Sequence, residues 1–273
     1  MELSTFELLV KRIAPVTDPV ADPVGAAVAR RVVQGYFLTL SNLETANLAY
    51  QLEFFISRPN PADPNRSLFD QADAIYDIAG ANLNLKLYGD SSTTRFRTSF
   101  TIPAGQTASF QLLPKPALFF APVPQLEVRG YVVLSLPPIF DLNSFSFKAQ
   151  TNRPARVLLN PEMRGTFFPN DFPAPPPAGL DGDFDQINYP LAIASGKGLN
   201  TLDPEPTFFP GLISTNPAAI ATLKAELIAK LAVAPNELSK IQALIEFGDL
   251  VKANPLASPS EFSSLIASLV VPT

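Results

Sequence analysis

The chain of 273 residues contains no histidine, no cysteine and no tryptophan. Histidine is the commonest general base and, together with cysteine, the commonest protein ligand of zinc and other transition metals. The missing thiol also removes the cysteine nucleophile and every disulfide scaffold. Most hydrolase and oxidoreductase mechanisms are therefore closed to this chain, and we expect a protein that is not an enzyme and that needs no cofactor.

Charged residues are scarce as well. They make up 16% of the chain, against roughly 25% in an ordinary soluble protein, whereas hydrophobic residues make up 47%. The formal net charge is -5 and basic residues cluster only in pairs such as Lys11-Arg12 and Arg30-Arg31, so we expect no nucleic-acid partner. No apolar run approaches the roughly 18 residues that span a bilayer, so we expect no membrane insertion. The apolar surplus must then be buried in a core or against other chains.

The first residues do not read as a secretory signal. In MELSTFELLVKRIAP, Glu2 and Glu7 interrupt the stretch where a signal peptide carries its apolar run. A cytoplasmic location is therefore expected. Export to the surface or the exterior by a route that reads no such signal is the alternative.

Residues 1–27 are expected to form an N-terminal helix or extended arm. Ser4 and Glu7 have the spacing of a capping box, and apolar residues recur at helical spacing up to Ile13. The same letters also suit a strand. Residues 14–25 repeat the letters DPV, and proline interrupts both helix and strand there.

Residues 28–165 predict an antiparallel β-sandwich or jelly roll. In LAYQLEFFIS, residues 48–57, apolar positions alternate with the rest at the period of a strand that buries one face. About eight such short strands, separated by Gly and Pro turns, indicate a mainly β fold. The expected strands cover residues 31–40, 48–57, 82–88, 94–102, 107–113, 126–136, 144–150 and 155–159.

Residues 216–273 predict a small C-terminal appendage of three helices. Asn216 is followed by Pro217 and an apolar stripe, which is a typical helix start. A second helix is expected from Asn236. The third is expected from Ser258, which opens a capping box with proline at the first helical position.

Residues 166–215 predict an extended strap, because the segment is rich in proline and phenylalanine. The tetrapeptide TFFP occurs at residues 166–169 and again at residues 207–210. The segment is too long for an ordinary loop and too apolar for ordinary disorder. Two destinations remain open: the strap wraps its own domain, or it reaches a neighbouring copy and locks it by strand addition or pocket filling.

The apolar surplus favours the second destination. The expected interface residues share an apolar side chain on the strap or on the last helix, and they are Phe167, Phe168, Phe172, Phe208, Phe209, Phe262, Leu265 and Leu269. We therefore predict a non-enzymatic structural subunit of a filament, shell, coat or tubular layer. Its expected partners are copies of itself, with a second structural protein as a further candidate.

Two other classes remain as alternatives. One is a ligand-binding, carbohydrate-binding or adhesive sandwich. The other is a carboxylate-based enzyme, for which Asp70, Asp73 and Asp77 would share one face if residues 69–77 were helical.

A divalent cation is the single cofactor for which the sequence offers a pattern. Asp181, Asp183 and Asp185 occupy the first, third and fifth positions of a calcium-loop spacing. Gln186 stands where that loop needs glycine, and Ala192 stands where it needs a bidentate glutamate. A solvated turn is therefore the competing interpretation.

Overall fold

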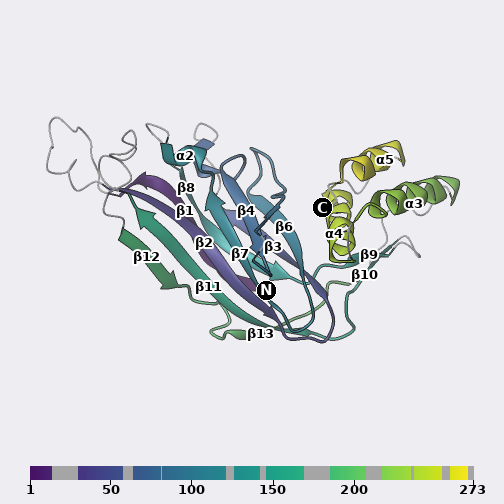
Figure 1. The fold of residues 1–273 in the computed structure, drawn as a ribbon, viewed down its shortest axis with the longest axis horizontal. Coiled ribbons are helices and arrows are strands. Elements are labelled where there is room, and N and C mark those ends of the chain that lie inside the picture. Colours follow the sequence, from purple (N-terminus) through teal and green to yellow (C-terminus); the bar gives the residue numbers. More distant parts are fainter. Residues whose placement is uncertain are drawn as a thin grey trace.

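The structure is a computed structural model that describes residues 1–13, 30–57, 64–80, 82–120, 126–141, 146–168, 185–206, 217–234, 237–253 and 259–269. Within these residues, one large antiparallel sheet fills most of the molecule and three helices lie at one end of it (Figure 1). The predicted mainly β, antiparallel fold with a small C-terminal helical appendage is confirmed.

The large sheet has eleven strands among the described residues. They are β1 (Glu2–Arg12), β2 (Arg31–Asn42), β3 (Leu48–Ile56), β4 (Ala72–Asp77), β5 (Leu83–Leu85), β6 (Arg95–Ile102), β7 (Thr107–Pro114), β8 (Leu126–Ser135), β11 (Ala155–Phe167), β12 (Asp185–Pro190) and β13 (Leu199–Leu202). A separate hairpin joins β9 (Ile139–Asp141) to β10 (Ser146–Lys148). Two short helical turns, η1 (Pro64–Arg66) and α2 (Ala117–Phe120), lie between strands.

The sheet divides into two branches at β2. One edge of β2 pairs with β11 along residues 32–42. The other edge is shared, because residues 31–34 pair with β1 and residues 36–41 pair with β7. One branch continues through β4 and β5, and the other through β8, β3 and β6. A bridge between Tyr88 and Arg97 brings the two branches back together, so the sheet nearly closes around its core.

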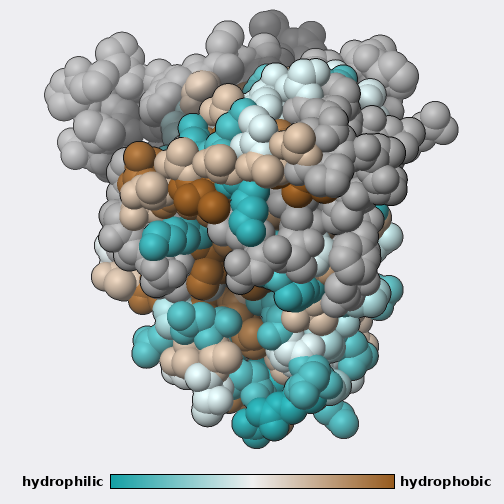
Figure 2. Space-filling model, turned by 90° about the vertical axis from the view of Figure 1, so that its right-hand side faces the viewer, coloured by the Kyte–Doolittle hydropathy of each residue, from teal (hydrophilic) through white to brown (hydrophobic). Residues whose placement is uncertain are grey.

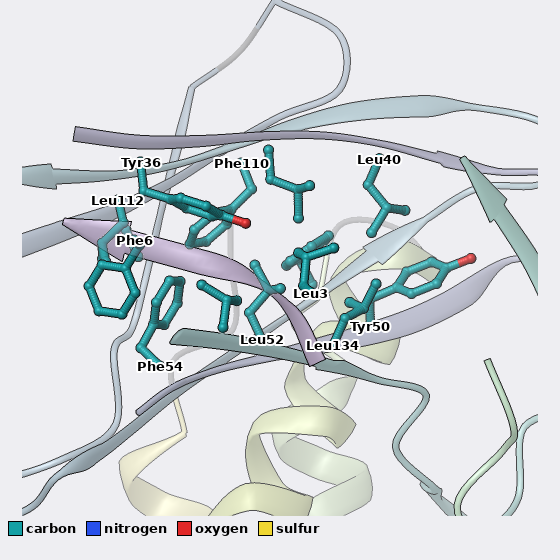
Figure 3. Close-up of a cluster of buried hydrophobic side chains, with 14 of the residues drawn as sticks. Leu3, Phe6, Tyr36, Leu40, Tyr50, Leu52, Phe54, Phe110, Leu112 and Leu134 are labelled. Atoms are coloured by element: carbon teal, nitrogen blue, oxygen red, sulfur yellow. The ribbon is translucent and has the colours of Figure 1, made fainter. Parts of the chain in front are cut away.

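Large side chains from both branches meet in that core (Figure 3). The ring of Phe54 on β3 lies 5.3 Å from Phe6 on β1, 6.0 Å from Tyr36 on β2 and 5.9 Å from Phe110 on β7. All four side chains are buried. Burial of each contributes about 1.5–3 kcal/mol, and because the rings come from both branches, their contacts hold the branches face to face.

The N-terminal segment is a strand of this sheet, so the helical alternative for residues 4–13 is wrong. β1 pairs with β8 over most of its length and with β2 at its end. Leu8, Leu9 and Val10 are all buried, which is typical of a strand that is covered on both faces. Its apolar residues therefore lack the clean alternation that would have separated strand from helix.

Residues 72–77 form β4, so the helical face expected to carry three aspartates does not exist. Ala72, Ala74 and Tyr76 point into the core, and Asp73 and Asp77 lie on the opposite face of the strand. The buried residues Ala72 and Ala74 are small, which hides the period of two in the sequence.

The three C-terminal helices begin where their caps predict: α3 (Pro217–Leu231), α4 (Glu237–Ala253) and α5 (Pro259–Ser268). They enclose a second hydrophobic core together with the β9–β10 hairpin. Its rings stand edge to face, with Phe140 5.0 Å from Phe147 and 4.9 Å from Phe247. Helix α4 also contacts β6 and β3, which attaches the helices to the large sheet.

The described part of the expected strap lies on its own domain. β12 and β13 both pair with β11. Between them, Leu191 and Ile193 pack against the main core, and the N–H of Ala194 donates to the carbonyl of Leu3 at 2.8 Å. For residues 185–206 the first of the two destinations is therefore the observed one. Residues 169–184 and 207–216 lie outside the described residues.

Candidate functional site

A groove with an apolar floor crosses the outer face of the sheet where β7, β2, β11 and β12 lie side by side. It encloses about 460 Å³. Its lining comes from the four strands and α2: Val33, Gly35, Phe37, Leu113, Pro114, Phe119, Arg164, Gly165, Thr166, Gln186, Ile187 and Asn188.

Glycine stands in the middle of the strand that forms the groove floor. Val33, Gly35 and Phe37 occupy every second position of β2, so they share one face of the sheet. A Cβ atom on Gly35 would lie 2.6 Å from Cδ2 of Leu113 and 3.0 Å from the carbonyl oxygen of Leu112. The side chain of Leu113 on β7 therefore packs directly over Gly35, and the floor is formed by Leu113 together with Val33 and Phe37.

The floor is apolar and half-exposed. Val33, Phe37, Leu113 and Phe119 are all partly buried and none is fully covered. Apolar side chains gathered in a hollow at the surface are typical of sites that another molecule covers. This surface can therefore take up an apolar partner without rearranging the sheet.

One wall of the groove carries a fixed cation. The Arg164 guanidinium lies 4.7 Å from the centroid of the Phe37 ring, and its Nη2 and Nε donate to Oε2 of Glu162 at 2.7 and 2.9 Å. The hydrogen bond from Arg164, helped by one from Asn160, lowers the pKa of the Glu162 carboxyl below its usual value. Arg164 is thus held between a ring and a carboxylate, with its charge at the rim of the groove.

The same side of the groove also carries hydrogen-bonding side chains. Thr166, Gln186 and Asn188 come from β11 and β12, where Thr166 pairs with Gln186 and Arg164 pairs with Asn188. β12 is an edge strand whose outer side pairs with none of the described residues. Sheet edges that no strand pairs with are templates for strand addition.

The first TFFP copy lies at the end of this groove. The N–H of Phe168 donates to the carbonyl of Arg31 at 2.8 Å, and Nε of Arg30 donates to the carbonyl of Phe168 at 3.2 Å. The Phe168 ring lies 6.2 Å from the ring of Phe119, which lines the groove, and the Arg30 guanidinium lies 5.9 Å from the centroid of the Phe167 ring. Two of the expected interface residues therefore adjoin the groove.

The other expected interface residues lie elsewhere. Phe172, Phe208 and Phe209 are outside the described residues. Phe262 and Leu269 are 1% and 3% exposed in the helical core, and Leu265 is half-buried. Their apolar face is thus occupied within the chain, and binding to another copy through it would require the helices to open.

The described surface of the helical end carries both apolar and polar residues. In Figure 2, which looks onto that end, hydrophobic residues are interspersed with hydrophilic ones. Large exposed side chains there include Ile228 at 47% and Val233 at 71% exposure, on and just after α3. The groove at the other end of the sheet is therefore the stronger candidate for an interface.

The aspartates predicted to bind a cation are not gathered by the described residues. Asp181 and Asp183 lie outside them, and the carboxylate of Asp185 forms an ion pair with Arg30. Across the described ranges, no three Asp or Glu side chains come together as a metal site would require.

The aspartates considered for catalysis are split between two places. Asp70 and Asp73 line a smaller cavity of about 230 Å³ between β4, β5 and β6, with Lys115 Nζ 3.9 Å from Oδ1 of Asp70. Asp77 instead accepts hydrogen bonds from the N–H groups of Ala79 and Gly80 and stabilises a turn. The geometry does not unite the three carboxylates.

Comparison of the chain with protein-family models, with curated proteins and with solved structures finds no match in any of the three. The helices of the described residues also include none with the length and apolar character needed to cross a membrane.

Sequence reasoning missed the groove itself. Its floor combines β2, β7 and β11, which are distant along the chain, so no local pattern reports it. The one local signal was Gly35 inside the strand RVVQGYFLTL, because glycine in a strand often marks a close approach or a binding surface.

Proposed function

We propose that the protein is a non-enzymatic structural subunit that self-associates, and that the groove between β7, β2, β11 and β12 is its main interface. The observation that carries the proposal is the half-exposed apolar floor beside β12, whose outer side pairs with no strand of the described residues. An apolar hollow and an open edge in one place favour a peptide segment over a small polar ligand.

Two apolar features that favoured self-association in the sequence are buried within the chain itself, so the proposal relies on the groove. Residues 185–206 pack on their own sheet, and the apolar stripe of α5 packs in the helical core. The proposal therefore relies on the groove and the outer edge of β12 among the described residues, and on the second TFFP copy, which lies outside them.

The test is the oligomeric state of the purified chain and of one groove variant. We expect a mass in multi-angle light scattering that grows with concentration, and ordered assemblies in negative-stain images. Val33→Lys places a charge on the apolar floor and should leave the chain monomeric. Thr39→Lys is the matched control, since Thr39 lies on the same face of the same strand but outside the groove, and it should assemble like the parent chain.

A chain that stays monomeric from low micromolar to its highest soluble concentration would contradict the proposal. If that monomer bound sugars on a glycan array, the alternative of a carbohydrate-binding module would take its place. The cavity lined by Asp70 and Asp73 would then be the first place to look for the sugar.

A further inference from the structure

We infer that the occupant of the groove is the second Phe-Phe-Pro segment, residues 207–210, of another copy of this chain. The inference rests on the proposed self-association and names the two surfaces that meet. It follows from where the chain holds that segment, from how the first copy of the tetrapeptide is bound, and from the chemistry of the groove.

The residues before the segment are fixed at the end of the sheet that lies away from the groove. Leu202 pairs with Ala155 at the start of β11, whereas the groove lies at Gly165 near the end of β11 (Figure 1). With a rise of about 3.3 Å per strand residue, roughly 30 Å separate the two places. β8 spans the same distance. Its first residue, Leu126, pairs with Val10 beside the groove strand β2, and Leu136 follows the opposite end of β8.

The tether is too short for the segment to reach the groove of its own chain. The N–H of Glu205 donates to the carbonyl of Leu136 at 3.0 Å, and Pro204 forms a bridge with the same residue. Phe208 follows Glu205 by three residues, and an extended chain spans at most about 3.6 Å per residue, or about 11 Å in all. If the second Phe-Phe pair enters a groove, that groove must therefore belong to a different copy.

The first copy of the tetrapeptide shows what chemistry binds such a pair. Its carbonyls accept hydrogen bonds from Arg30, at 3.2 Å for Phe168 and 3.4 Å for Phe167. Its rings contact the side chains of Phe119 and Arg30. One arginine and one aromatic neighbour thus satisfy both the backbone and the rings.

The groove offers a second arginine and a second ring. Arg164 is held over Phe37 at the rim, and Phe37 provides a ring on the floor beside Phe119, which already contacts Phe168. Gln186 and Asn188 add donors and acceptors for an extended backbone. Proline after the two phenylalanines restricts the second one to extended geometry, which suits a segment laid along a strand.

The first test is a complementation of two variants. The donor variant has its donor segment disabled by Phe208→Ser and Phe209→Ser and keeps an intact groove. The acceptor variant has its groove disabled by Val33→Lys and keeps an intact segment. Each alone should be monomeric. Mixed together they should form a one-to-one pair, because one intact groove then meets one intact segment.

The second test uses a peptide with the sequence of residues 203–212, DPEPTFFPGL. Fluorescence anisotropy should show that it binds the donor variant, and that binding weakens at least tenfold when Val33→Lys is added or when both peptide phenylalanines become serine. Thr39→Lys should leave the affinity unchanged.

A third measurement does not depend on the fold of a groove variant. With Phe208→benzoylphenylalanine, illumination of a mixture of isotope-labelled and unlabelled chains should cross-link position 208 to Phe37, Leu113 or Ile187 of the other chain. Cross-links confined to one chain, or to the helical end, would overturn the inference.

The outcomes separate this inference from the proposed function. If the parent chain assembles and Val33→Lys abolishes assembly, but the donor variant assembles normally and the peptide does not bind, the groove is an interface with a different occupant. If the parent chain never assembles and the peptide does not bind, both proposals fail.

Discussion

Single glycines control how closely strands approach in this sheet. The tightest case is Gly130 on β8, where a Cβ atom would lie 1.9 Å from the carbonyl oxygen of Phe55 on the paired strand β3. That atom belongs to the backbone, so a rotamer change cannot relieve the contact. Gly35 differs, because its nearest neighbour is the side chain of Leu113.

We predict that Gly130→Ala destabilises the fold by about 1–3 kcal/mol or more, the usual cost of inserting a methyl group where there is no space. Gly198→Ala is the matched control, since its Cβ would meet its nearest atom at 3.4 Å, and it should be nearly neutral. Urea unfolding measures both. Equal midpoints for the two variants would contradict the assigned contact.

A second residue-scale feature is the carboxylate of Glu44, which ties the β2–β3 turn to β11. It accepts hydrogen bonds from the N–H and the Nε of Arg156 at 3.0 and 3.2 Å and from Nη2 of Arg153 at 3.0 Å. The backbone N–H of Arg156, followed by its side chain, lowers the pKa of Glu44 from its ordinary value of 4.5.

This pKa shift sets the sign of a pH prediction. Because the folded pKa lies below the unfolded one, the stabilisation from Glu44 is present above pH 4.5 and is lost as the pH falls through the folded value. Glu44→Gln should therefore be less stable than the parent chain at neutral pH and should match it in strong acid. Urea unfolding across that range tests this, and a difference that persists in acid would contradict it.

At the scale of elements, the helices and the β9–β10 hairpin form a core of their own. Phe247 lies 4.9 Å from Phe140 and 6.3 Å from Phe262, so one row of rings joins the hairpin to α4 and α5. A methyl group on Gly248 would meet Cε1 of Phe147 at 2.8 Å, which shows how closely α4 approaches the hairpin. The helices are thus stabilised by residues from the middle of the chain.

We predict that Phe262→Ala costs about 3–5 kcal/mol in the stability of the helical unit, as for other fully buried phenylalanines. Ile228→Ala, at a position that is 47% exposed, should change it by less than about 0.5 kcal/mol. Hydrogen exchange of α3–α5 resolves the local effect. A Phe262→Ala chain that keeps its helices but loses assembly would instead restore Phe262 to the interface.

Local signals predicted some elements well and others poorly, for physical reasons. Helix caps are local, so the starts at Pro217, Glu237 and Pro259 agree with the prediction. β12 was missed because its pairing with β11 is not encoded in its own residues, while the prolines of residues 166–215 suggested only an extended strap. The groove was equally hidden, since its lining comes from strands that are distant along the chain and pair only in the folded sheet.

At the scale of the whole molecule, the groove lies at one end of the sheet and Pro204 and Glu205, which precede the second Phe-Phe segment, lie at the other. A copy bound through its groove still has an unused segment, and its partner still has an unused groove. Contacts between two different surfaces propagate into open chains unless the rotation between copies closes a ring. The two proposals together therefore favour a filament over a closed pair.

The pairing of β2 with β11 also governs when the protein can fold during its synthesis. Arg30 and Phe168, which bond at one end of this pair, are 138 positions apart along the chain. A ribosome adds about 5–20 residues per second, so the early strand waits on the order of ten seconds for its partner to be made. During that interval the hydrogen-bonding groups on the β11 side of β2 have no partner and can bond to another nascent chain. We therefore expect a chaperone to improve the yield of folded protein during synthesis.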